Sequence, residues 1–156
     1  MSDATLRRAD SPESWAAARA LVEEYAASLD LDLTFQGFQH EIASLPQEYG
    51  PPDGCFLLAA RGGQFVGCGG LRRHSPSDCE MKRLYVAPAH RGAGIARLIA
   101  GALIEHARQR GYAAMLLDTL PSMIGAHALY ASLGFKATAA YRYNPVPGAT
   151  FWRLAL

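Results

Sequence analysis

Hydrophobic positions follow two different spacings along the chain, and the changes between them outline its elements. Apolar residues recur at helical spacing in four segments, and shorter segments between them have the composition of strands. We predict helices at residues 10–29, 38–45, 94–110 and 122–133. We predict strands at residues 4–9, 55–60, 64–73, 79–87, 112–119, 135–143 and 150–156. This order predicts an α/β protein of the mixed α+β kind, with helices on both faces of its sheet.

Local signals set the ends of several elements. Asp10 or Ser11 can cap the first helix, and Gly111 ends the third. The second helix is expected to stop before Pro46, because the residue before a proline disfavours helical geometry. Residues 29–37 show no clear period and are expected to form a loop.

Two segments give predictions about which side chains share a face. The helix 94–110 should bury one stripe, consisting of Ile95, Leu98, Ile99, Ala102 and Leu103. The strand 79–87 should alternate, with Glu80, Lys82, Leu84 and Val86 on one face and Met81, Arg83 and Tyr85 on the other.

Composition narrows the class of protein. A chain of 156 residues, 50% hydrophobic and 19% charged, fits one domain with a proper core, which we place at residues 1–156. The net charge of +1 gives no general electrostatic case for nucleic acid or a membrane surface. No apolar run is long enough to span a membrane, and residues 1–10 lack the apolar core of a signal peptide. We therefore expect a cytoplasmic protein that binds neither nucleic acid nor membrane.

Cysteine and histidine residues show no metal-binding pattern. Cys55, Cys68 and Cys79 fit no zinc spacing, and their odd number argues against a disulfide framework. They are interpreted as free thiols in a reducing compartment. The histidines His40, His74, His90 and His106 form no ligand spacing, so no metal is expected.

The segment from Val86 to Arg97 joins a predicted strand to a predicted helix. Pro88 prevents simple continuation of the strand, and Gly92 and Gly94 let the backbone approach a ligand closely. A helix start offers unpaired N–H groups and the positive end of its dipole, which together favour phosphate. Arg91 and Arg97 can add charged hydrogen bonds. A purely structural glycine turn is the alternative, since the nucleoside triphosphate and dinucleotide fingerprints are both absent or incomplete.

The surrounding residues strengthen the ligand-binding interpretation. The run Arg91-x-x-Gly94-x-Ala96 matches the Arg/Gln-x-x-Gly-x-Gly/Ala signature of the GNAT superfamily of acyl-CoA N-acyltransferases. The flanking "LYVAPAHRG" and "ALYASLGF" resemble that superfamily in type, order and spacing, and the good match spans residues 80–135. The resemblance implies a mostly antiparallel sheet with one splayed parallel strand pair. It also implies an N-acetyltransferase that uses acetyl-CoA as co-substrate.

The resemblance assigns cofactor contacts residue by residue. The matching backbone positions for the coenzyme A diphosphate, with help from Arg97, are Arg91, Gly92, Ala93, Gly94, Ile95 and Ala96. The positions that match main-chain contacts to the pantetheine arm are Leu84, Tyr85 and Val86. Many relatives carry asparagine seven residues before the site tyrosine. Here Met123 stands at that position, so one cofactor hydrogen bond is missing unless the adjacent Ser122 replaces it.

Two residues match catalytic positions of the superfamily. Tyr130 matches the tyrosine that faces the thioester sulfur, and Glu80 matches the general-base glutamate of some members. The structural alternative for Tyr130 is a buried aromatic side chain of the core. The structural alternative for Glu80 is a partner for Lys82 or Arg83. Proton transfer from an ordinary tyrosine to a thiolate is unfavourable by about 2 kcal/mol. Hydrogen bonding to the developing thiolate therefore matters as much as full proton transfer. A base helps most with alkyl amines, whose deprotonation at pH 7 costs about 4.6 kcal/mol, against about 1.4 for an α-amino group.

Further polar residues lie where the acceptor would bind. His127 shares a helix face with Tyr130 but is more simply explained as a satisfied surface histidine. Asp118 and Thr119 end a strand, and Asp118 can hold an amine or cap the next helix. The remaining candidates for contacts with the acceptor are Asp30, Asp32, Phe35, Tyr141, Tyr143 and Asn144.

The function predicted from the sequence is acetyl transfer to a primary amine of a small molecule or peptide, by direct attack in a ternary complex. The alternative is a non-catalytic regulatory or interaction domain that binds acyl-CoA without turnover. A homodimer through the apolar strand 150–156 is compatible with the sequence.

Overall fold

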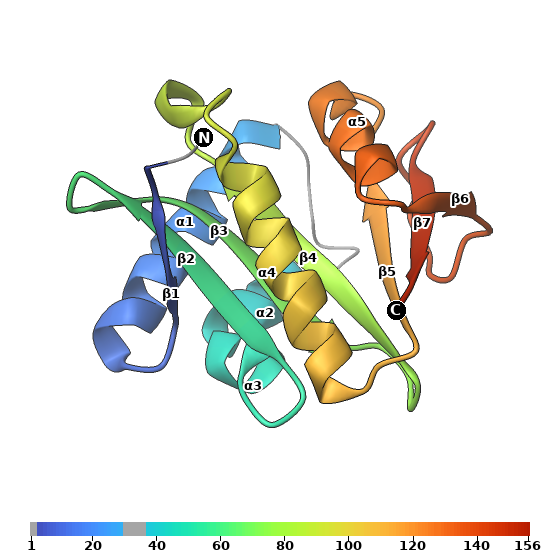
Figure 1. The fold of residues 1–156 in the computed structure, drawn as a ribbon, viewed down its shortest axis with the longest axis horizontal. Coiled ribbons are helices and arrows are strands. Elements are labelled where there is room, and N and C mark those ends of the chain that lie inside the picture. Colours follow the sequence, from blue (N-terminus) through green and yellow to red (C-terminus); the bar gives the residue numbers. More distant parts are fainter. Residues whose placement is uncertain (1–2, 30–36) are drawn as a thin grey trace.

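The computed structural model describes residues 3–29 and 37–156, which form a seven-stranded mixed sheet with helices on both faces (Figure 1). The strands are β1 (Thr5–Arg8), β2 (Cys55–Arg61), β3 (Gln64–Arg73), β4 (Asp78–Val86), β5 (Ala114–Thr119), β6 (Lys136–Thr138) and β7 (Thr150–Ala155). The helices are α1 (Pro12–Leu29), α2 (Phe38–Ala43), α3 (Leu45–Tyr49), α4 (Ile95–Arg110) and α5 (Ile124–Ser132), with a 3₁₀ turn at Pro88–His90. No helix in these two ranges has the length and apolar character to cross a membrane.

The strands lie in the order β1-β2-β3-β4-β5-β7-β6, and every described pairing is antiparallel except that of β4 with β5. The parallel pairing is short: Asp78 pairs with Ala114, Cys79 with Met115 and Glu80 with Leu116. Beyond this point both strands continue, β4 to Val86 and β5 to Thr119, without pairing to each other. The expected splayed parallel pair is therefore confirmed.

A β-bulge in β4 changes the alternation of its side chains. The register with β3 shifts between Cys68 and Gly70, and Arg83 has φ of 62°, in the left-handed region. Because an extra residue enters the strand here, Lys82 and Arg83 both turn toward the face covered by α1–α3. The predicted alternation of β4 is therefore wrong beyond Lys82. Leu84 lies on the α4 face together with Met81, with which it was not predicted to share a face.

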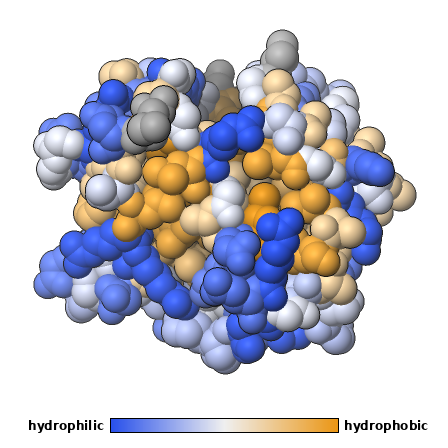
Figure 2. Space-filling view, viewed as in Figure 1, coloured by the Kyte–Doolittle hydropathy of each residue, from blue (hydrophilic) through white to orange (hydrophobic). Residues whose placement is uncertain are grey.

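Two hydrophobic cores lie on opposite faces of the sheet. One core joins the sheet to α4 and α5, and the other joins it to α1, α2 and α3. Helix α4 lies directly on β3 at Gly69, where an added Cβ would be only 2.7 Å from the Ile99 side chain. On the face seen in Figure 1, apolar side chains form two groups with polar side chains between them, and one group covers the region between α4 and β5 (Figure 2).

Several element boundaries differ from the sequence prediction. Helix α2 stops before Pro46 as predicted, but at Ala43, two residues before its predicted end. Pro46 itself lies in the first turn of α3, where its missing N–H costs nothing. The predicted strand 135–143 is wrong beyond Thr138, because the chain leaves the sheet and turns Tyr141 and Arg142 toward Glu80. The prediction for α4 fails at Leu98, which is 36% exposed, and at Ala102, which is only partly buried. Ser11 caps α1, since its hydroxyl accepts the Ser14 N–H at 3.2 Å.

A buried ion pair ties the bulge to α2. Arg83 donates to Glu41 through Nε at 2.7 Å and Nη2 at 3.0 Å, and both side chains are almost fully buried. Burial raises the pKa of the Glu41 carboxyl, but the hydrogen bonds and charge of Arg83, helped by Arg72, outweigh it and hold that pKa below 4.5. The ion pair therefore stabilises the fold above the unfolded-state pKa, and this contribution is lost as pH falls through the folded-state value.

We expect Glu41→Gln to lower the free energy of unfolding at neutral pH by about 3–5 kcal/mol, because Arg83 keeps its buried charge without a counterion. Urea unfolding would measure this difference. The difference should shrink well below pH 4.5, where wild-type Glu41 is itself protonated. Glu23→Gln is the matched control, since its exposed pair with Arg19 contributes little. A difference that stays constant down to acid pH would contradict this account.

Candidate functional site

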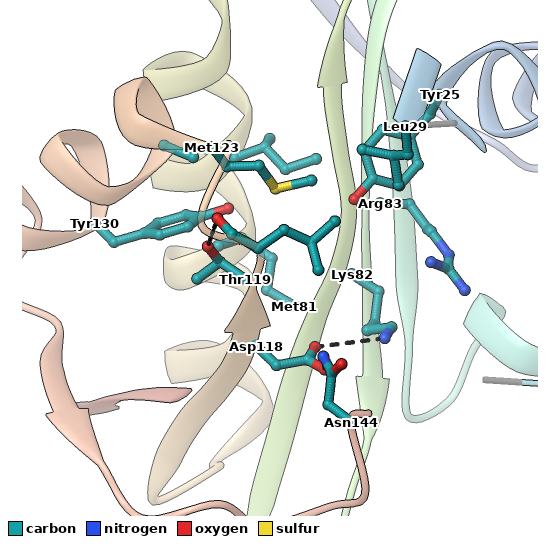
Figure 3. Close-up of a pocket in the computed structure, with 13 residues that line it drawn as sticks. Tyr25, Leu29, Met81, Lys82, Arg83, Asp118, Thr119, Met123, Tyr130 and Asn144 are labelled. Atoms are coloured by element: carbon teal, nitrogen blue, oxygen red, sulfur yellow. Dashed lines mark hydrogen bonds and ion pairs between the residues drawn. The ribbon is translucent and has the colours of Figure 1, made fainter. Parts of the chain in front are cut away.

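The gap between the diverging ends of β4 and β5 holds a pocket (Figure 3). Its apolar lining consists of Tyr25, Leu29, Met81, Leu84, Leu120, Met123 and Ala126. Its polar lining consists of Lys82, Arg83, Asp118, Thr119, Tyr130 and Asn144. Figure 3 shows Tyr130, Met123 and Thr119 on one side of the pocket, with Tyr25, Leu29 and Arg83 opposite them.

Charged groups form one end of this pocket. Lys82 Nζ lies 3.6 Å from Asp118 Oδ1, across the gap between the two strands (Figure 3). Asn144 Nδ2 donates to Asp118 Oδ2 at 3.1 Å, so both oxygens of this carboxylate are engaged. Burial lowers the pKa of the Lys82 ammonium to about 8, although the charges of Glu80 and Asp118 act in the opposite direction. This end therefore presents one cationic and one anionic side chain to the pocket.

Tyr130 lies on the α5 side of the pocket. Its side chain is 7% exposed and its ring packs on Phe135, with centroids 5.7 Å apart. Burial raises the pKa of Tyr130 well above its ordinary value of 10.0. The hydroxyl therefore suits hydrogen-bond donation to a developing anion better than release of its proton.

Thr119 and His127 are joined on the same side of the pocket. Thr119 Oγ1 lies 2.5 Å from His127 Nε2 and 3.2 Å from the carbonyl oxygen of Leu120, which it can reach as a donor. The His127 ring packs on Trp152, with centroids 6.0 Å apart. The simple surface role predicted for His127 is therefore incomplete, because its ring contacts a side chain of the pocket lining.

Glu80 lies outside the pocket lining, in a buried cluster behind it. Its Oε1 accepts from Arg142 at 2.9 Å and from Arg72 at 3.1 Å, and its Oε2 accepts from the Tyr141 hydroxyl at 2.6 Å. Arg72 also donates to Glu48 at 3.1 Å. Three donors, two of them cationic, therefore fix this carboxylate in place. The base role of Glu80 stays a prediction, and its surroundings favour a role in holding Tyr141 and Arg142 in place.

The segment between β4 and α4 presents a row of unpaired amides. Gly92 and Gly94 have φ of 83° and 79°, and Gly94 is the residue before α4. Leu98 is the first α4 residue whose N–H bonds back to this segment, at 3.1 Å from the Gly94 carbonyl. Within the described ranges, the N–H groups of residues 92–97 have no hydrogen-bond acceptor. An anion fits here, since these donors coincide with the positive end of the α4 dipole.

The two arginines of this segment take different positions. Arg91 folds back on β4, donating through Nε to the Val86 carbonyl at 2.9 Å, with its guanidinium over the Tyr85 ring. Arg97 donates to the Ser132 hydroxyl on α5 at 2.5 Å. The segment therefore contacts both sides of the gap.

The other candidates are distributed unevenly. Leu84 and Asn144 line the pocket, whereas the Tyr85 hydroxyl points to α1 and donates to Glu24 at 2.6 Å. Tyr143 is 73% exposed. Asp30, Asp32 and Phe35 lie outside the described residues. No cluster of potential metal ligands is found in the described part of the chain, and its free cysteines are all buried.

Sequence reasoning missed part of the site. Lys82 and Arg83 were considered only as partners for Glu80, yet both line the pocket. A usable signal was present, because two adjacent basic residues, Lys82 and Arg83, stand in the middle of a predicted strand, where alternation would place only one of them on each face. The place of Tyr25 opposite Tyr130 depends on tertiary packing, which helical spacing alone does not show.

A mixed sheet that parts between two parallel strands, with an amide-lined turn at the end of one of them, is the arrangement that the resemblance to acyl-CoA N-acyltransferases implies. The model of the acetyltransferase (GNAT) family matches residues 16–135. An uncharacterized N-acetyltransferase of Schizosaccharomyces pombe is 40% identical over 88% of this chain and 86% of its own length. The chain therefore belongs to the acetyltransferase (GNAT) family, and it is an acyltransferase.

Other similar proteins extend this comparison. Human N-acetylaspartate synthetase is 35% identical over 70% of this chain, a match that spans 37% of its own length. The crystal structure of an acetyltransferase from Streptococcus agalactiae has a TM-score of 0.80 at 19% identity, with both chains fully covered. A Salmonella typhimurium acetyltransferase, solved with its cofactor acetyl-CoA, has a TM-score of 0.68 at 25% identity, covering 99% of this chain and 94% of that one.

We expect Glu80→Gln to lower the free energy of unfolding by about 3 kcal/mol, because Arg72 and Arg142 lose a buried counterion. Urea unfolding at neutral pH would measure this loss. Glu105→Gln on the surface of α4 is the control, since its pair with Arg108 is exposed. A variant that keeps its stability but loses turnover would instead restore the general-base role.

Proposed function

We propose that this enzyme transfers the acetyl group of acetyl-CoA to a primary amine by direct attack in a ternary complex. The observation that carries the proposal is the continuity of the site along β4. The amide-lined turn follows its last residue, Val86, and the pocket begins at Leu84. A cofactor held by its diphosphate at the turn can thus reach the pocket along this strand.

The residues of the turn fit coenzyme A. The unpaired amides of residues 92–97 supply donors for a diphosphate, with the Arg91 main chain beside them. Arg97 adds charge, and the open space around Gly92 and Gly94 admits the ligand. Main-chain groups of Leu84, Tyr85 and Val86 would hold the pantetheine arm, because β4 has no partner strand on this edge. Bound there, acetyl-CoA supplies the thioester.

Tyr130 would donate a hydrogen bond to the thioester sulfur as negative charge develops on it. Its raised pKa favours a donor that keeps its proton. Met123 lines the same side of the pocket in place of the asparagine found in many relatives, so its contact with the pantetheine arm is apolar.

The acceptor proposed from the charged end of the pocket is a small α-amino acid. Asp118 would hold the ammonium group and Lys82 a carboxylate, replacing their long contact of 3.6 Å. Hydrogen-bond donors already engage the carboxylates of Asp118 and Glu80, so the site offers no unengaged carboxylate as a base. The acceptor therefore has to be an amine that loses its proton at low cost. An α-amino group meets that condition, at about 1.4 kcal/mol at pH 7. The similarity to N-acetylaspartate synthetases supports an acceptor of this class.

Release of coenzyme A from acetyl-CoA should be stimulated by amino acids, L-aspartate first among them, more than by alkyl amines.

Tyr130→Phe should lower kcat roughly 10- to 100-fold with little change in the KM of acetyl-CoA, because the lost bond forms mainly in the transition state. Steady-state assays over an amine panel would measure both effects. Tight coenzyme A binding without product from any amine would instead support the non-catalytic alternative.

We expect Gly94→Ala to weaken coenzyme A binding about 10-fold or more and to destabilise the fold by about 1–2 kcal/mol, since alanine disfavours positive φ. Calorimetric titration and thermal unfolding would measure the two effects. Gly101→Ala is the matched control: it also has open space for a Cβ, but it lies within α4 and has ordinary helical geometry. That variant should be slightly stabilised and bind normally. Equal binding by both variants would contradict the role of the turn.

A further inference from the structure

We propose that Thr119 and His127 form a relay that delivers a proton to the thiolate leaving group. This inference rests on the proposed acetyl transfer and adds the source of the proton. Thr119 is the pocket residue that would contact the sulfur, and His127 acts through it from α5.

The two contacts of the Thr119 hydroxyl define the direction of the relay. His127 Nε2–H can donate to Thr119 Oγ1 at 2.5 Å while Oγ1–H donates to the Leu120 carbonyl at 3.2 Å. Both bonds exist together only when the imidazole is the donor. The contact with Leu120 is long, so the hydroxyl can turn to a stronger acceptor such as a thiolate.

The placement of the pair fits the leaving group. Tyr130 and Thr119 lie on the same side of the pocket, opposite Tyr25 and Leu29 (Figure 3). His127 is partly exposed and its ring is held by Trp152, so it can exchange protons with solvent while keeping its orientation. Histidine is the usual carrier of protons near neutral pH.

A separate proton source is needed because Tyr130 is a poor acid. The transfer of a proton from an ordinary tyrosine to a thiolate is already unfavourable by about 2 kcal/mol, and burial of Tyr130 increases that cost. In the relay, Tyr130 only donates a hydrogen bond. Thr119 and His127 supply the proton.

The proton movements balance. As the carbon–sulfur bond breaks, its electron pair stays on sulfur, and the Thr119 hydroxyl proton moves to that sulfur. The Nε2 proton of the imidazolium moves at the same time to Thr119 Oγ1, which leaves His127 neutral. The proton lost by the attacking amine goes to solvent, and solvent returns one proton to His127.

The test compares substitutions that keep or remove each part of the relay. We expect His127→Gln, whose amide can still donate to Thr119 but carries no transferable proton, to lower kcat roughly 100-fold with an unchanged KM for acetyl-CoA. Thr119→Val should cause a similar loss and Thr119→Ser should retain activity. The double variant should be no worse than either single one, because both remove the same step. Added imidazole should restore part of the activity of His127→Ala.

Thermal unfolding and calorimetric coenzyme A binding would verify that each variant is folded, and His106→Gln on α4 is the matched control. Normal kcat in His127→Gln, or a loss confined to the KM of acetyl-CoA, would overturn the relay while leaving acetyl transfer intact. Additive losses with no rescue by imidazole would also overturn it, in favour of a structural role. If the wild type yields no product with any amine, the proposed function fails, and the relay fails with it.

Discussion

The ion pair between Arg83 and Glu41 holds β4 in the shape on which the site depends. Arg83 has a left-handed backbone, which is unfavourable for a side chain of this size by about 1–2 kcal/mol. Its two hydrogen bonds to Glu41 fix the guanidinium against α2 and so favour the bulge. With the extra residue in β4, Arg83 shares the face of Lys82, and both side chains line the pocket. One long-range contact thus fixes part of the charge of the pocket.

Charge is balanced locally around the proposed acceptor end. Arg83 pairs with Glu41, Lys82 with Asp118, and Arg72 and Arg142 with Glu80. Buried charges are tolerated only when such pairs and hydrogen bonds compensate for the loss of water. The pairs differ in tightness: those of Arg83 and Glu80 have contacts of 3.1 Å or less, whereas Lys82 and Asp118 are 3.6 Å apart. The loosest of these pairs, Lys82 with Asp118, has both of its members in the pocket lining, where a ligand has to compete with their contact.

Local sequence patterns predicted much of the fold, because helix periodicity, caps and glycine turns act over a few residues. The helices α1, α4 and α5 and the turn before α4 follow such patterns. The bulge at Arg83 was not predictable in this way, since it depends on Glu41, 42 residues earlier. The segment after Thr138 has strand composition, yet Tyr141 bonds to Glu80 across 61 residues and leaves the sheet. The role of Tyr130 came from family resemblance, and the role of the turn came from both its glycines and that resemblance. The contact of His127 with Thr119 required the structure.

The short parallel ladder between β4 and β5 confines the pairing of these two strands to one end of the gap. Three residue pairs connect the half that carries β1–β4 to the half that carries β5–β7, while the antiparallel ladder of β5 and β7 has six. Because the ladder lies at one end of the gap, a small rotation about residues 78–80 and 114–116 is amplified toward Val86 and Thr119. Cys79 and Met115 pair within this ladder, are fully buried and do not line the pocket. A change in their packing would therefore act on the gap without touching a ligand inside it.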